Sequence, residues 1–253
     1  MVTRQIAQGL IEKWEKMQTV YIPLREERFS RMLDILEEWL PSKFNALDLG
    51  SGPGSLSVRL LKRFPQASCT AVDCDPLQLG LGQSCYGTMK GRLTWVEADL
   101  RKNDWWEALD GARFDAVLST TALHWLTGPQ LRRTYRYAWG LLKKRGILFN
   151  GDRATVGPYS KKLKRISTGA YLNVKRSHGM KQPNQPWSEW WREVMRVKDL
   201  RSLVEERERR FPRPSESDFP ASAHLRYLRE AGFSEADVVW RDLSDCIIAG
   251  LKD

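Results

Sequence analysis

The sequence predicts an α/β fold in which a parallel sheet is covered by helices on both faces. Short apolar segments alternate with amphipathic helical segments through the first 150 residues, and such alternation is typical of parallel sheets. A glycine-rich turn, Gly50–Gly54, joins the first apolar segment to a helix. Polar residues follow most of these segments, and ligands of such sheets bind beyond the carboxyl ends of the strands. The sequence therefore places a ligand site at one edge of the sheet.

The first predicted elements lead into the glycine-rich turn. Residues 24–40 form an amphipathic helix, because apolar residues recur there at helical spacing. These are Phe29, Met32, Leu33, Leu36 and Leu40. Residues 46–49 (ALDL) form a short buried strand, and residues 54–64 form the helix after the turn. Pro65 marks the end of that helix.

Four further strands and one helix complete the first 152 residues. The strands are residues 68–73, 92–99, 113–120 and 145–152. Residues 128–143 carry an apolar stripe and form a helix before the last of these strands. The polar residues at the strand ends are Asp48–Gly50, Asp73, Asp99, Ser119–Thr120 and Asn150–Asp152.

The pattern changes after Asp152. Residues 153–186 are basic and rich in Gly, Pro, Ser and Asn, and they give no clear strand. Residues 187–210 form one or two amphipathic helices whose stripe includes three tryptophans, and a linker follows at 210–220.

The end of the chain regains α/β character. A helix at 221–231 is capped by Gly232, and strands follow at 236–240 and 245–251.

Composition and charge limit the classes of partner. The formal net charge is +10, and residues 151–214 hold 16 basic but only 7 acidic residues. No apolar run is long enough for a membrane span, and the N-terminus is too charged for a secretory signal. The four cysteines contain no C-x-x-C pair, so we expect reduced thiols in a cytoplasmic protein, with neither disulfides nor a bound metal.

The glycine turn favours a cationic nucleoside over a dinucleotide. A dinucleotide turn needs G-x-G-x-x-G, but the third glycine position is Ser55 here, and Pro53 removes an amide that a pyrophosphate could use. Asp48 adds negative charge, which suits the sulfonium and ammonium groups of S-adenosylmethionine. Asp73 at the second strand end can accept both ribose hydroxyls, although a dinucleotide enzyme shares this feature. Asp99, followed by an apolar residue, suits an adenine; each acid could alternatively be an ordinary cap or strand-end residue.

The ordered motifs resemble a known family. The loop ALDLGSGPG is followed in order by AVDCDP, WVEADL, FDAVLSTTALHWL and LLKKRGILF. Together they resemble the class I S-adenosylmethionine-dependent methyltransferases. The segment STTALHWL is most similar to the branch that contains trans-aconitate methyltransferases and related small-molecule enzymes. The resemblance covers residues 24–152 well and is fainter over 221–250.

The resemblance implies a Rossmann-like, mostly parallel seven-stranded sheet whose last strand is antiparallel. It implies a single domain over 1–253, with a cofactor-binding core at 1–152, a basic helical insertion at 153–215 after the fifth strand, and a closing helix and strands at 216–253. It also implies S-adenosylmethionine as cofactor, with S-adenosylhomocysteine as product.

The resemblance also assigns cofactor-binding roles. The methionine end would contact Asp48, Gly50, Ser51, Gly52 and Gly54, with Ser51 where many relatives carry Cys. Asp73 would hold the ribose, Asp99 and Leu100 the adenine, and Ser119 and Thr120 the sulfonium side, and Cys74 is also expected to bind the cofactor. The acceptor would be a small molecule, and the protein a monomer or homodimer with no membrane partner.

His124 is the candidate general base for an acceptor that must lose a proton. It follows the fourth strand, and its alternative role is packing against Trp125. The other histidines, His178 and His224, are expected to be surface or packing residues. Tyr21 and Arg25 could cover the carboxylate of the cofactor, or could only pack and pair with neighbouring acids.

The insertion leaves further alternatives open. Trp187, Trp190 and Trp191 are expected to pack against the sheet, or else to form an apolar lid over the acceptor. The basic segment is a solvated face or a site for an anionic acceptor, such as a carboxylate or a carrier-bound acyl group. Its charge also suits RNA, but the residues after the fourth strand lack the motifs of base-methylating enzymes, so a tRNA substrate is disfavoured and stays an alternative. A non-catalytic scaffold that kept the fold is the other alternative.

Overall fold

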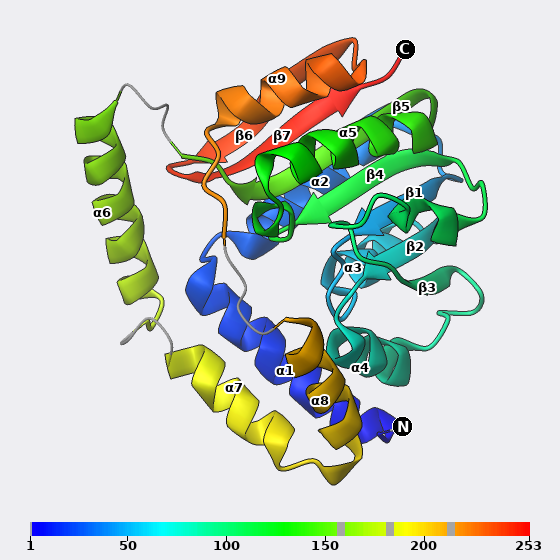
Figure 1. The fold of residues 1–253 in the computed structure, drawn as a ribbon, viewed down its shortest axis with the longest axis vertical. Helices are drawn as coiled ribbons and strands as arrows, with labels where there is room; N and C mark the ends of the chain where they lie inside the picture. The colour runs from blue at the N-terminus through cyan, green and yellow to red at the C-terminus, as the bar shows by residue number, and fades with distance from the viewer. Residues whose placement is uncertain (1, 156–159, 181–184, 212–215) are drawn as a thin grey trace.

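The computed structural model describes residues 2–155, 160–180, 185–211 and 216–253 (Figure 1). Within these residues, seven strands form one sheet in the order β3-β2-β1-β4-β5-β7-β6. They are β1 (Asn45–Leu49), β2 (Ser68–Asp73), β3 (Leu93–Glu97), β4 (Phe114–Thr120), β5 (Leu142–Arg153), β6 (Glu235–Asp242) and β7 (Asp245–Leu251). Strands β1 to β5 are parallel, while β7 is antiparallel to both β5 and β6. The predicted α/β sheet is confirmed, including its antiparallel last strand.

Helices cover both faces of the sheet because successive strand residues point to opposite sides. On one face, α2 (Arg25–Trp39) and α3 (Ser55–Arg63) share a core with Phe149 of β5. On the other face, α5 (Gly128–Leu141) and α9 (Ala221–Ala231) share a core with residues that include Leu148 of the same strand (Figure 1). Gly232 ends α9 at φ 109°, as its predicted capping role requires.

A further group of helices packs beside the β1–β3 half of the sheet. Its members are α1 (Arg4–Tyr21), α4 (Pro76–Tyr86), α7 (Gln185–Met195) and α8 (Arg201–Arg210). They share a third apolar core, and Figure 1 shows α7 and α8 alongside α1. Neither α1 nor α4 was predicted from the sequence.

Helix α6 (Lys161–Ser177) lies at the edge of the molecule, within the insertion that the resemblance implied to be helical, although the residue pattern itself indicated no helix at 161–177 (Figure 1). Three short 3₁₀ helices complete the described elements: η1 (Trp105–Leu109), η2 (Leu123–Trp125) and η3 (Lys198–Leu200). Residues 212–215 of the predicted linker lie outside the described residues. None of the described helices has the length and apolar character needed to cross a membrane.

The tryptophan stripe of α7 packs against helices, so the prediction that it packs against the sheet was wrong. Trp190 is buried, and its Nε1 donates a hydrogen bond to the Leu10 carbonyl of α1 at 3.0 Å. Its ring centroid lies 5.0 Å from that of Trp14 in an edge-on arrangement. The apolar side of α1, a helix that the sequence analysis did not predict, supplies the surface against which the tryptophans pack.

Candidate functional site

The turn after β1 brings the chain close to β4. The amides of Gly50 and Ser51 both donate to the carbonyl of Val72, at 2.8 and 3.0 Å. Gly50 has φ 70°, and a Cβ there would lie 2.3 Å from the Cβ of Ala122. Only glycine combines this conformation with such a close approach, so the turn fixes the β4 segment against the β1 segment.

The same turn has an open side at Gly52. This residue has φ 55°, and a Cβ added to it would meet no atom within 4 Å. Its amide donates to Oδ2 of Asp73 at 2.7 Å. Gly54 caps α3 at φ 86°, where a Cβ would lie 2.6 Å from the ring of Trp95. Gly52 is therefore the point at which a ligand can approach the backbone of the loop.

Asp73 lies half-buried at the end of β2. Its other oxygen, Oδ1, accepts the amide of Asp75 at 2.8 Å. Burial, with a further contribution from Asp75, raises the pKa of Asp73 to about 6. Each oxygen keeps a second lone pair, so the ionised carboxylate can still accept hydroxyl groups. The neighbouring Cys74 is half-buried, and burial raises the pKa of its thiol.

Asp48 is buried below the loop. It accepts the hydroxyl of Ser57 at 2.6 Å, a contact that ties β1 to α3. Burial raises its pKa to about 6 despite that hydrogen bond. This hydrogen bond gives Asp48 a structural role next to the glycine loop, which the sequence analysis left open as an alternative to cofactor binding.

The third acid, Asp99, follows β3 and is paired. The guanidinium of Arg101 donates to both of its oxygens, at 2.8 Å from Nε to Oδ1 and from Nη2 to Oδ2. Burial acts to raise the pKa of Asp99, but these hydrogen bonds outweigh it and hold the pKa below its usual value. Leu100 beside it is buried, and Phe211 lies 4.8 Å from the guanidinium of Arg101. The acid and the apolar residue expected around the adenine thus lie together, with an arginine held between Asp99 and Phe211.

Helix α8 covers this end of the sheet with two arginines. Arg207 pairs with Asp75 at 2.6 Å, and Arg210 pairs with Glu97 at 2.6 Å. Arg210 also donates to the carbonyl of Cys74 at 3.3 Å. The basic C-terminal part of α8 is therefore held by acids that follow or end β2 and β3.

Helix α1 reaches the opposite side of the glycine loop through Glu15. Its carboxylate accepts the hydroxyl of Ser55 at the start of α3 and pairs with Arg25 and with Arg59. Burial acts to raise the pKa of Glu15, but the two arginines and the hydroxyl lower it to about 2. Nη1 of Arg25 also lies 3.6 Å from Oε1 of Glu26. In this structure Arg25 therefore pairs with neighbouring acids, which is one of the two roles that the sequence left open.

The two residues that end β4, Ser119 and Thr120, differ in burial and in their contacts. The hydroxyl of Ser119 donates to the carbonyl of Leu49 at 2.7 Å, and Ser119 is buried. It joins β4 to β1 directly below the glycine turn. Thr120 is half-buried, and the next residue, Thr121, has φ 54°, an uncommon conformation for a β-branched residue. This turn redirects the chain toward His124.

His124 forms a buried pair with Asp152 of β5. Its Nδ1 lies 2.9 Å from Oδ1 and 3.0 Å from Oδ2 of the carboxylate, and its backbone amide donates to Oδ2 at 3.2 Å. Burial acts to raise the pKa of Asp152, but His124 and Arg28 lower it to about 2. An ionised Asp152 accepts the proton of Nδ1, which leaves the lone pair of the ring on Nε2. The ring centroid also lies 4.8 Å from that of Trp125, so the base and packing alternatives coexist in the geometry.

Sequence reasoning placed Asp152 among the polar strand ends without giving it a role, and it did not single out Arg28. Arg28 is 1% exposed, pairs with Asp245 of β7 at 2.7 Å, and donates to the hydroxyl of Thr121. The signal was present, because Arg28 adjoins Phe29 on the buried side of an amphipathic helix, where a charge needs a partner.

The other two histidines lie as expected. His224 is buried, with Nδ1 at 2.7 Å from the hydroxyl of Tyr135, and burial lowers its pKa to about 4. His178 is exposed at the end of α6. Among the described residues, no group of three or more His, Cys, Asp or Glu side chains could hold a metal ion.

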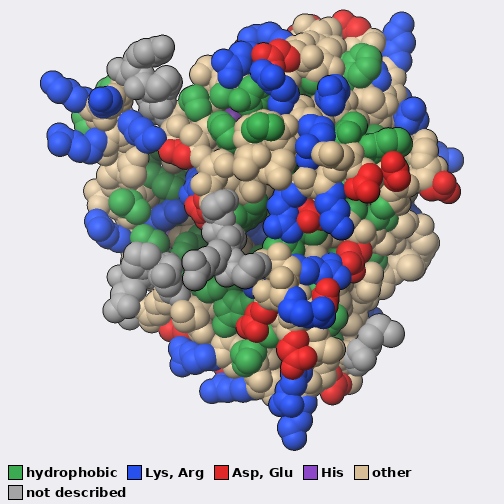
Figure 2. All heavy atoms as spheres, in the orientation of Figure 1, with side chains coloured by type: hydrophobic (Ala, Val, Ile, Leu, Met, Phe, Trp, Pro, Cys, Tyr) green, Lys and Arg blue, Asp and Glu red, His purple; other side chains and the backbone are tan. Residues whose placement is uncertain are grey.

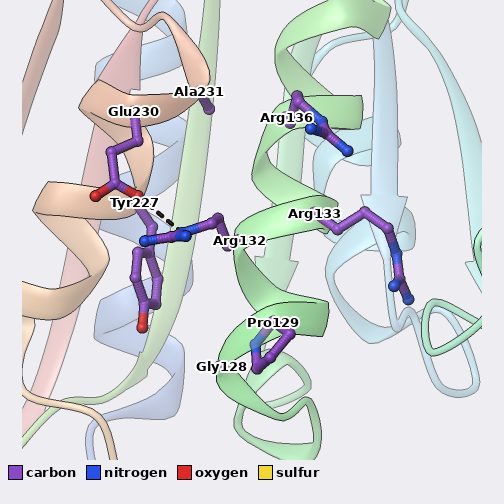
Figure 3. A pocket seen from close by; sticks show the side chains of 8 residues that line it. All are labelled: Gly128, Pro129, Arg132, Arg133, Arg136, Tyr227, Glu230 and Ala231. Carbon is purple, nitrogen blue, oxygen red and sulfur yellow. Dashed lines mark ion pairs between the residues drawn. The ribbon is translucent and has the colours of Figure 1, made fainter.

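A separate pocket lies between α5 and α9, and Figure 3 shows its lining side chains. Arg132 crosses it to pair with Glu230 at 2.8 Å and stacks on Tyr227. None of the residues expected to bind cofactor or acceptor lines it. We therefore place the candidate site at the glycine loop and the ends of β1, β2 and β4.

Comparison with known proteins gives one family match and several relatives. A family of methyltransferase domains matches residues 46–146. A malonyl-[acyl-carrier protein] O-methyltransferase of Acetivibrio thermocellus is 24% identical over 148 residues, which is 58% of this chain and 49% of that protein. A trans-aconitate 2-methyltransferase of Escherichia coli is 29% identical over 101 residues, 40% of this chain and 36% of that protein. The matches thus span half or less of these two relatives.

A solved structure supports the fold over nearly the whole chain. Human N-acetylserotonin methyltransferase in complex with SAM superimposes with a TM-score of 0.54 and 14% identity, covering 95% of this chain and 56% of that one. At this identity the likeness concerns the fold, and it includes the helices outside residues 46–146.

Proposed function

We propose that this chain is a class I S-adenosylmethionine-dependent methyltransferase that transfers a methyl group to a small-molecule acceptor; the methyltransferase domain matched at residues 46–146 and the fold support this proposal. One observation carries the proposal. Of the three glycines of the loop, only Gly52 has open space beside its Cα, and a nucleoside can approach the backbone there next to the carboxylate of Asp73.

The residues present fit this cofactor. Asp73 would hold the ribose hydroxyls, Leu100 would contact the adenine, and the open backbone at Gly52 would face the methionine end. Asp99 would reach the adenine amino group with Arg101 beside it. Asp48 would act from below the loop through its charge. When bound, S-adenosylmethionine supplies a methyl group on a positively charged sulfur, which is already a good electrophile.

The contribution of the chain is then alignment and proton removal. Holding two reactants in line can supply up to roughly 7–11 kcal/mol in favourable cases. His124, oriented by Asp152, would take the proton of a hydroxyl, amine or acidic carbon at Nε2, a step worth about 10²- to 10⁴-fold. A carboxylate acceptor would need no base. The helices of 153–215 would cover the acceptor, and the basic charge of this segment suits an acceptor with an anionic group.

The test is a methyl-transfer assay over an acceptor panel. The panel contains carboxylates such as trans-aconitate, an acyl group on a carrier protein, and neutral phenols and amines. On an acceptor that must lose a proton, His124→Gln should lower kcat by about 10²- to 10⁴-fold, while His178→Gln at the exposed histidine should not. Normal turnover by His124→Gln on every such acceptor would remove His124 from the role, and no transfer to any acceptor would favour a non-catalytic scaffold.

A further inference from the structure

Helix α6 differs from every other described α-helix because none of its residues is buried. It also carries six basic residues and no acidic one. These are Lys161, Lys162, Lys164, Arg165, Lys175 and Arg176. Figure 1 shows α6 at the periphery of the molecule, and Figure 2 shows Lys and Arg side chains gathered in this part of the surface.

One side of α6 is attached to the rest of the protein. Lys164 pairs with Asp218 at 2.8 Å, and the hydroxyl of Tyr171 donates to the carbonyl of Tyr21 at 3.5 Å. Lys175 is half-buried beside the ring of Tyr171, at 4.6 Å from its centroid. These three side chains recur at helical spacing, so they define the inner side of the helix.

Another side of α6 presents aliphatic residues to the solvent. Leu163 is 60% exposed and Ile166 is 63% exposed, and they lie one turn apart. Lys162 and Arg165, which adjoin them in sequence, are also exposed. A basic helix with an exposed aliphatic side is typical of helices that lie in the interface of an anionic membrane. We propose that α6 docks this chain on an anionic lipid surface, with Leu163 and Ile166 entering the acyl boundary and the flanking basic residues contacting headgroups.

Charge and chemistry favour this occupant over two others. In a symmetric dimer formed through α6, two helices whose only charged residues are basic would face each other, which is electrostatically unfavourable. A nucleic acid would satisfy the Lys and Arg side chains but would leave Leu163 and Ile166 without an apolar partner. An anionic lipid surface provides both kinds of contact, and its plane suits a helix at the molecular edge. The sequence-based expectation of no membrane partner considered only spanning segments, whereas α6 would lie on the surface.

The test is vesicle co-sedimentation of the full chain. The vesicles consist of phosphatidylcholine alone or mixed with phosphatidylglycerol, and the assay is repeated at rising salt. Leu163→Ser/Ile166→Ser removes the aliphatic contact and keeps the charge, and Ile6→Ser/Val239→Ser is its matched control because both residues are exposed elsewhere. Lys162→Gln/Arg165→Gln removes two charges, and Lys43→Gln/Lys90→Gln removes two exposed charges elsewhere. Circular dichroism establishes that each variant is folded.

We expect salt-sensitive binding to the anionic vesicles only. The serine pair should weaken it about tenfold or more, and the glutamine pair about thirtyfold, whereas both control pairs should bind as the wild type does. Absence of binding, equal binding to neutral vesicles, or binding that neither α6 pair weakens would overturn the proposal. Binding to RNA but not to vesicles, weakened by the glutamine pair alone, would overturn it in favour of a nucleic-acid surface. None of these outcomes depends on methyl transfer.

Discussion

Replacing Asp152 by Asn should destabilise the fold by about 2 kcal/mol at pH 7. Asn resembles the protonated carboxyl in size, so the substitution removes the advantage of the ionised form. The pKa of Asp152 falls from 3.8 to about 2 on folding, and a difference of this size corresponds to about 2 kcal/mol. Both carboxylate oxygens accept hydrogen bonds from His124, and in Asn one of these positions becomes a donor facing a donor.

The stability lost in Asp152→Asn should depend on pH in one direction. Because the folded pKa of Asp152 is depressed, its stabilisation is complete above the unfolded pKa and is lost as pH falls through the folded pKa. The difference between the wild type and Asp152→Asn should therefore shrink to about 1 kcal/mol at pH 3. Urea unfolding at pH 7 and pH 3 measures it, and thermal unfolding at pH 7 should show a decrease in Tm of about 4–8 °C.

A surface control separates this effect from a general loss of charge. Asp104 is exposed, so Asp104→Asn should change stability by less than about 0.5 kcal/mol at either pH. If Asp152→Asn is as stable as the wild type at pH 7, or if the difference grows at pH 3, the buried pair does not have the electrostatics described above.

Three further predictions concern the cofactor side of the site. Affinity for S-adenosylmethionine should fall as the pH drops below about 6, where Asp73 becomes protonated. The Asp73→Asn variant should bind S-adenosylmethionine more weakly than the wild type, and its affinity should depend less on pH. Calorimetric titrations at pH 7.5 and pH 5 measure both effects. Gly50→Ala should cost more than about 2 kcal/mol in unfolding free energy, because its methyl group would meet Ala122, whereas Gly52→Ala should cost only about 1 kcal/mol and still impair cofactor binding; equal losses of stability would contradict the geometry of the loop. Glu15→Gln should destabilise the protein by about 2–3 kcal/mol at pH 7 and by progressively less from pH 4.5 toward pH 2, since the folded pKa of Glu15 is depressed; an unchanged urea midpoint at pH 7 would show that the arginine contacts contribute nothing.

The sheet and the glycine turn could be predicted because their signals are local. The strand at 245–251 and the helix at 221–231 agree with the structure residue for residue. The motif order predicted the methyltransferase resemblance, which the family match at 46–146 and the trans-aconitate relative confirm.

Two of the missed helices, α4 and α6, lack a strong local signal. Helix α4 contains glycines among its leucines, and α6 carries Gly169 together with serine, threonine and asparagine, all of which lower helix propensity. Tertiary packing stabilises α4, whose Leu77 and Leu81 belong to the third core, and α4 contacts α1 and α8. The tryptophan stripe of α7 was recognised, but the sheet was wrongly predicted as its packing partner because helix α1 was not predicted.

The positions of the candidate site residues at the strand ends could be predicted, but the side-chain contacts between them and their partners could not. Asp48, Asp73 and Asp99 could be placed at the edge of the sheet from the pattern alone. The partners of Asp99 and His124, namely Arg101 and Asp152, follow from side-chain geometry that periodicity does not contain.

Binding of S-adenosylmethionine to the purified chain is the most direct measurement of the central claim. Isothermal titration should show one saturable site for S-adenosylmethionine and for S-adenosylhomocysteine, lost in the double variant Gly52→Ala/Asp73→Ala, and no heat of binding with NAD. Retention of NAD or a flavin nucleotide, with no response to either sulfur compound, would contradict the account.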